Sequence, residues 1–180
     1  LSVDSASERR DEDLLYRVRG FFHDQQEIHP IPGWERESRS LLPYAERHWL
    51  VFSLEGGAFV GFDPPNSRFF RETLLQNVRR EYSLLFLLAQ FQRFALIGLS
   101  ERVAEAWLRS GQHSPADRLR VFSGIQNDFL GFTARGYFSQ VMQRENHHRA
   151  FRRWHEVLEL ERLYEEVRDE VAAMRAEAQI

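Results

Sequence analysis

Residues 82–99 read YSLLFLLAQFQRFALIGL, and this stretch decides the fold. It lies inside residues 68–110, which contain a single glycine and no proline, so nothing in the sequence interrupts a helix there. The stretch is almost long enough to cross a bilayer, but Gln90, Gln92 and Arg93 lie at its centre, where an arginine is costly in lipid. We therefore interpret it as a buried bundle helix whose polar side chains need hydrogen-bonding partners.

Two more helices are predicted after this one. Ser114 is a typical helix N-cap and Pro115 suits the first helical position, which predicts a helix from Pro115 to about Thr133. Residues 137–178 then predict one long C-terminal helix, far longer than the ~11–12 residues of an average helix. A helix of that length usually needs a long neighbour or a partner chain to cover its apolar face.

The segment before the bundle carries a strand signal. Two β-rich runs, His48–Leu54 and Ala58–Phe62, flank Glu55-Gly56-Gly57 and predict a β-hairpin over residues 48–62. The predicted fold class is therefore mainly α (α+β), a helical bundle with a long C-terminal helix and a small β-hairpin appendage. The predicted divisions are a flexible lead-in at 1–13, an α/β appendage at 14–67 and a helical bundle at 68–180. Within the appendage we expect a short helix at 14–22 and an irregular connection at 24–46, pinned by Trp34.

The composition excludes several kinds of chemistry. All 24 basic residues are arginine, and the chain has no cysteine, so a Schiff-base lysine, a P-loop lysine and a thiolate nucleophile or metal ligand are impossible. The net charge is only −3, which creates no global field for a nucleic acid, and we expect no nucleic-acid partner. No set of residues spells out a reaction, and the sequence favours a protein that is not an enzyme.

The C-terminal helix carries an assembly signal. Its apolar residues are spaced alternately three and four apart, which is the a/d pattern of a coiled coil. These residues are Val157, Leu160, Tyr164, Val167, Val171, Met174 and Ala178. One interpretation is packing within the chain, on the helix at 82–110. The other is a seam that forms a homo-oligomer.

The most chemical cluster lies at the start of the same helix. Glu145 and His148 form a Glu-x-x-His pair, and His155 lies seven residues after His148 on the same helix face. Such pairs build metal sites in helical bundles when other helices supply matching ligands, but the other helices offer few here. A divalent-cation site at these three residues is one alternative, and solvated or salt-bridged side chains are the other.

Four arginines surround that cluster. They are Arg144, Arg149, Arg152 and Arg153. Such a group is usually a solvated face, but it would also suit an anion or an acidic partner, because guanidinium groups bind carboxylates and phosphates with two parallel hydrogen bonds.

Three segments near the C-terminus carry a family resemblance. Phe132-Thr133, Tyr137-Phe138-Ser139-Gln140-Val141 and Leu158–Val167 (LELERLYEEV) resemble the cytoplasmic part of CorA-like divalent-cation transporter relatives. The resemblance covers about residues 80–178 and implies a cytoplasmic domain that feeds a long stalk helix and assembles as a pentamer. The Gly-Met-Asn signature and the transmembrane pair of that family are absent from this sequence, so no pore or metal residue is carried over.

Together these features favour a non-enzymatic, soluble assembly or regulatory domain. In the CorA-like interpretation it is cytoplasmic, forms a homo-oligomer through its C-terminal helix and meets a membrane only through segments outside this chain. The alternative is a helical-bundle enzyme that binds a metal or an anion on the face of Glu145, His148 and His155. A third class is a binder of a nucleic acid or another anionic partner through the four arginines.

Overall fold

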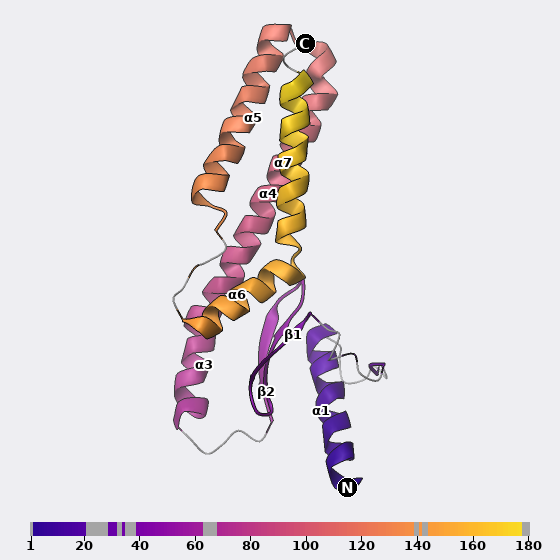
Figure 1. Cartoon of the computed structure of the whole chain (residues 1–180), viewed down its shortest axis with the longest axis vertical. Coiled ribbons are helices and arrows are strands. Elements are labelled where there is room, and N and C mark those ends of the chain that lie inside the picture. Colours follow the sequence, from indigo (N-terminus) through magenta and orange to yellow (C-terminus); the bar gives the residue numbers. More distant parts are fainter. Residues whose placement is uncertain are drawn as a thin grey trace. The chain divides into compact units, whose positions relative to one another are not determined.

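The computed structural model describes residues 2–20, 29–31, 34, 39–62, 68–138, 141 and 144–177, with side chains from residue 10 onward. These residues form a mainly helical structure with one small sheet, which confirms the predicted fold class (Figure 1). The chain divides into two compact units. The first contains Leu1–Phe86 and Met142–Leu158, and the second contains Leu87–Val141 and Glu159–Ile180. The division therefore falls inside a helix, whereas the sequence suggested one at residues 67 and 68.

The sheet of the first unit has three antiparallel strands in the order β1-β2-β3. The strands are β1 (Leu41–Ala45), β2 (His48–Phe52) and β3 (Gly57–Gly61). The predicted hairpin over 48–62 is confirmed as β2 and β3. The prediction of an irregular chain up to residue 46 is wrong at β1, which contains Pro43. Because β1 is an edge strand that pairs only with β2, a residue without an N–H is tolerated there.

Helices cover both faces of this sheet. Helix α1 (Ser2–Gly20) lies along one face, where Leu15 packs with Val51, Leu41 and Trp34 in a buried cluster. On the other face, the ring of Phe52 contacts that of Trp154 from α6 (Glu145–Val157) with centroids 4.7 Å apart. Neighbouring residues of a strand point to opposite faces of the sheet, so Val51 packs on the side of α1 and Phe52 on the side of α6.

The segment predicted as a lead-in at 1–13 contains a helix. The backbone is helical from Ser2, and α1 runs without a break into the part that packs on the sheet. Two glutamates and two arginines in this segment, Glu8, Arg9, Arg10 and Glu12, are good helix formers.

The helix predicted from residue 68 is confirmed, although two of its turns are wider than α-helical. π-Helical turns at Phe69–Thr73 and Val78–Tyr82 flank α3 (Leu74–Asn77), and α4 (Ser83–Arg109) follows directly. A short 3₁₀ turn at Ser110–Gln112 ends this stretch.

The second unit is a bundle of three helices that run alongside one another in Figure 1: α4 from Leu87 onward, α5 (Pro115–Arg135) and α7 (Leu160–Glu177). Helix α5 begins as predicted, because the hydroxyl of Ser114 accepts a hydrogen bond from the backbone N–H of Asp117 at 3.2 Å. The bundle core consists of Leu96, Leu99, Val103, Ala106, Phe122, Ile125, Phe129, Val167, Val171 and Met174. Each helix contributes residues three or four apart, which is the pattern of bundle packing.

The single helix predicted over 137–178 is wrong, because α6 ends at Val157 and α7 begins at Leu160. Between them Glu159 has a φ of 52°, the left-handed conformation that stops a right-handed helix. Leu158 and Leu160 are both buried, but in an unbroken helix residues two apart point about 200° away from each other. The turn at Glu159 therefore allows both leucines to be buried.

The left-handed residue gives a stability prediction. The free energy of unfolding of Glu159→Gly should be about 1 kcal/mol higher than that of Glu159→Ala, because only glycine adopts positive φ without a steric penalty. The two variants lose the same exposed ion pair, in which Arg162 contacts the Glu159 carboxylate at 2.6 Å, so their comparison isolates the backbone effect. Urea unfolding of both variants measures the difference. Equal stabilities would contradict a strained residue at this turn.

Candidate functional site

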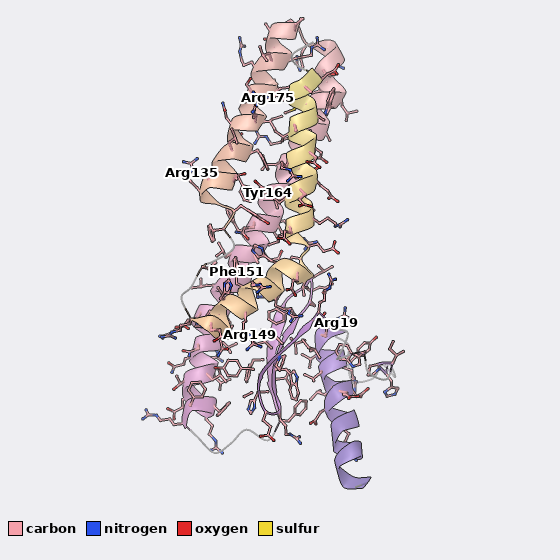
Figure 2. All side chains as sticks on the ribbon, in the orientation of Figure 1. Arg19, Arg135, Arg149, Phe151, Tyr164 and Arg175 are labelled. Carbon is pink, nitrogen blue, oxygen red and sulfur yellow. The ribbon has the colours of Figure 1, made fainter. Side chains whose placement is uncertain are left out.

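Helix α6 places the predicted site residues on different faces. Its inner face is buried and consists of His147, Ala150, Phe151, Trp154 and, just beyond the helix, Leu158. Arg149 and Arg152 are exposed on the outer face, as is Glu145. Figure 2 labels Phe151 and Arg149 on this helix. The helix thus separates an apolar side that holds the sheet from a charged side in water.

The buried histidine is His147, which the sequence interpretation did not single out. Its Nε2 lies 2.8 Å from a carboxylate oxygen of Glu81, and its ring centroid lies 4.7 Å from that of Tyr82. The contact to Glu81 is close but lacks the geometry of a hydrogen bond. Arg144 also reaches Glu81, with an N–O distance of 3.4 Å. The spacing of 147, 150, 151, 154 and 158 is a helical apolar stripe that includes this histidine, and it could have predicted its burial.

Burial dominates the electrostatics of this cluster. Loss of water lowers the pKa of His147, and the Glu81 carboxylate only partly opposes this effect. Burial also raises the pKa of Tyr82 to about 12, with smaller contributions from Tyr44 and Glu81. Both groups are therefore neutral at pH 7. These contacts join α6 and its N-cap residue Arg144 to the helical segment before α4, through an ion pair and through packed rings.

The structure does not assemble the predicted metal ligands. Glu145 is exposed, whereas His148 and His155 are half-buried, and the His155 ring contacts that of Phe151 with centroids 4.6 Å apart. Among the residues that the structure describes, no group of three or more histidine, aspartate or glutamate side chains could hold a metal ion. Burial lowers the pKa of His155 to about 4, so its ring is neutral at pH 7.

The four arginines also have different surroundings. Arg144 contacts Glu81, and Arg153 donates to the backbone oxygen of Arg39 at 3.1 Å and lies 3.5 Å from a carboxylate oxygen of Glu156. Arg149 and Arg152 are exposed on the outer face of α6. Two of the four guanidinium groups thus already have partners within the chain. This argues against a single anion site formed by all four arginines.

The a/d seam predicted for the C-terminal helix already has partners within the second unit. Val167, Val171 and Met174 lie in the bundle core with residues of α4 and α5, as the intramolecular interpretation predicted. Tyr164, labelled in Figure 2, stacks on Tyr137 with centroids 4.4 Å apart, and its hydroxyl lies 3.1 Å from that of Thr133. Leu160 is buried as well, whereas Val157 belongs to α6 and is separated from the rest of the seam by the turn at Glu159.

Helix α4 has a second apolar face that nothing in the described chain covers. Its inner seam is buried and includes Ala89, Gln92, Leu96, Leu99, Val103 and Ala106. On the opposite side Leu87, Phe91 and Phe94 are 60%, 56% and 64% exposed. We call these three residues the outer stripe. The sequence indicated this second face, because a helix that is apolar on every side is expected to be covered on every side.

The polar residues of α4 have specific environments. Gln92 is fully buried, and its Nε2 donates to the backbone oxygens of Gly136 at 3.0 Å and Phe138 at 3.2 Å. The sequence predicted that this side chain needs hydrogen-bonding partners, and two backbone oxygens of the segment after α5 supply them. The amide ties the chain after α5 to the inner seam of α4, on the side of the helix opposite the outer stripe.

No protein family, curated protein or solved structure matches the chain. Within the described residues, one helical stretch, Phe69–Gln112, is long and apolar enough to cross a membrane, and 28% of its most apolar window is buried. Length and composition alone do not separate a spanning helix from a core helix with an exposed interaction face.

Proposed function

We propose that the protein is a non-enzymatic assembly domain that associates with a second copy of itself through the outer stripe of α4. The observation that carries this proposal is the exposure of three large apolar side chains, Leu87, Phe91 and Phe94, in one line on a helix. Each is more than half exposed, although burying one such side chain stabilises a protein by about 1.5–3 kcal/mol. Contiguous exposed apolar surface of this kind marks an interaction site.

The spacing of the outer stripe favours a second copy as the partner. The three residues are separated by four and three positions, the a/d repeat with which one helix fits its knobs into the holes of another. Because an identical helix presents the same repeat, a two-fold axis would bury both stripes at once, as in the common isologous dimer.

The charges near the outer stripe are compatible with self-association. From Ser83 to Ser100 the helix contains one charged residue, Arg93, and charged pairs resume only at Glu101 and Arg102. The residues beside the stripe, Leu88, Ala95 and Ile97 among them, are uncharged, so two copies would not repel each other across the contact.

The size of the outer stripe predicts a weak complex. Three side chains of this size, each over half exposed, present on the order of 300 Å². A standard interface buries about 800 Å² per partner, so the flanking residues must contribute the rest. We therefore expect a dissociation constant in the micromolar range rather than an obligate oligomer.

From the CorA-like resemblance we further propose that this assembly belongs to a cytoplasmic domain. In that interpretation the three-helix unit is part of the cytoplasmic domain of a membrane protein. It forms the contacts between the subunits of that protein. The seam of α7 has partners inside the unit, which is why we assign self-association to the outer stripe instead. A pentamer rather than a dimer in solution would favour the CorA-like form of the proposal.

Phe91→Glu should weaken self-association at least tenfold, because it places a carboxylate at the centre of the apolar contact. Sedimentation velocity from 1 to 100 µM measures the change. Leu130→Glu is the matched control, since Leu130 is 53% exposed on α5 but lies outside the outer stripe. The control variant should associate like the unmodified chain.

Two results would contradict the proposal. A strict monomer at 100 µM would exclude a second copy as the partner. Flotation of the monomer with phosphatidylcholine–phosphatidylglycerol vesicles, lost in Phe91→Glu and kept in Leu130→Glu, would assign the outer stripe to a lipid surface instead.

A further inference from the structure

The first unit contains a cavity of about 430 Å³ between the hairpin and the helical segment that leads into α4. Its apolar walls come from β2 and β3, from Val78, Tyr82 and Phe86, and from Trp154 of α6. Binding sites for small molecules are typically cavities of about 300–1,000 Å³ that are lined mainly by apolar and aromatic side chains. The cavity is separate from the outer stripe, and its function does not depend on the assembly proposed above.

Aromatic rings shape the inside of this cavity. The Trp154 ring lies with its centroid 4.7 Å from that of Phe52 and 4.7 Å from that of Phe86, and Tyr82 also lines the space. A β-carbon at Gly57 would lie 2.8 Å from the Trp154 ring and 3.0 Å from the backbone oxygen of Val51. Glycine at this position therefore lets the hairpin approach the indole closely, and the cavity retains flat walls suited to an apolar body.

One cationic residue, Arg79, lies on the helical side of the cavity. Arg79 and Ser83 both line the space, and their spacing of four puts them on the same side of the helix. The guanidinium of Arg79 is exposed and forms no ion pair with any residue that the structure describes. The nearest acid in sequence, Glu81, is engaged by Arg144 and His147. Arg79 is therefore available to a carboxylate, which guanidinium binds with two parallel hydrogen bonds.

The acidic group of the cavity comes from the other wall. Glu55 lies in the hairpin turn, where its backbone N–H donates to the Ser53 hydroxyl at 3.3 Å. Its carboxylate disfavours an anion on the hairpin side and so orients the anionic end of a ligand toward Arg79. From these observations we infer that the cavity binds a small amphipathic carboxylate, with its apolar body against Trp154 and its carboxylate on Arg79.

Decanoate is the probe that tests this inference. Displacement of the fluorescent dye 1-anilinonaphthalene-8-sulfonate should show one decanoate per chain, measured below the micellar concentration. Decyltrimethylammonium, which has the same chain and the opposite charge, should displace the dye at least tenfold less well. Equal displacement by the two probes would overturn the assignment of a carboxylate.

Two neighbouring arginines provide matched variants. Arg79→Gln should weaken decanoate binding about tenfold and leave the binding of neutral decanol unchanged, whereas Arg80→Gln should change neither, because Arg80 does not line the cavity. An Arg79→Gln variant that binds decanoate like Arg80→Gln would overturn the proposal.

Filling the cavity gives an independent test. Ser83→Phe places a ring in the space and should abolish binding of both decanoate and decanol while circular dichroism stays unchanged. Phe91→Glu should bind normally, so that loss of self-association and loss of ligand binding are distinguishable. Binding retained in a folded Ser83→Phe variant, or lost in Phe91→Glu, would place the ligand outside this cavity.

Discussion

Phe151→Ala should lower the free energy of unfolding by about 3–5 kcal/mol, the range for removing a fully buried phenylalanine ring. Phe151 is 0% exposed on the inner face of α6, beside the ring of His155. Its loss removes apolar contact and leaves a cavity that the surrounding helix and sheet can fill only in part. Chemical denaturation at low micromolar concentration measures the change.

The same substitution at Phe91 is the matched control. Phe91→Ala removes an identical side chain from a position that is 56% exposed, so it should cost less than about 1 kcal/mol in the monomer. Comparable losses at both positions would mean that the outer stripe contributes to the fold, and it would then not be free for a partner. A small loss at Phe91, together with weaker self-association, would separate the residues that stabilise the unit from those that bind.

The parts of the fold that the sequence predicted correctly depend on local signals. Gly56 and Gly57 between two β-rich runs specify a hairpin whatever packs on it, and Ser114-Pro115 specifies where α5 begins. The long run without proline before residue 110 likewise predicts a helix. In each case the residues that determine the conformation are neighbours in the chain.

The parts that the sequence did not predict depend on tertiary contacts. Pro43 argues against a strand until β2 supplies a partner on one side only. The a/d spacing of Val157 and Leu160 continues through Glu159, although the turn there ends one helix and the two residues belong to different units. A periodic pattern predicts that a helix face is buried, but it does not identify the segment that covers this face.

The candidate sites show the same limit. The sequence singled out His148 and His155 because of their spacing from Glu145, whereas the buried His147 meets Glu81, which is far away in the chain. The cavity beside Trp154 likewise combines three separate segments. By contrast, the outer stripe could have been found from the sequence, since α4 carries more apolar residues than one buried face can use.

The stability of the chain should depend on His155 between about pH 6.5 and pH 4. Burial lowers the pKa of its ring from 6.5 to about 4 in the folded chain. Above pH 6.5 the ring is neutral in both states and contributes nothing to the dependence. As the pH falls through this window the unfolded chain takes up a proton that the folded chain resists, so the free energy of unfolding decreases.

His155→Gln removes this contribution and should flatten the pH dependence. The full shift corresponds to about 3 kcal/mol at 1.36 kcal/mol per unit, and partial solvent access at the half-buried ring reduces it to about 1–2 kcal/mol. Carboxylates titrate in the same window, so the quantity to compare is the difference between the unmodified chain and the variant in urea unfolding at pH 7 and pH 4. His113→Gln, which replaces an exposed histidine, controls for the loss of one imidazole.

Parallel curves for the unmodified chain and His155→Gln would show that the ring is protonated in the folded state as readily as in the unfolded chain. Its contact with Phe151 would then not keep water away from it.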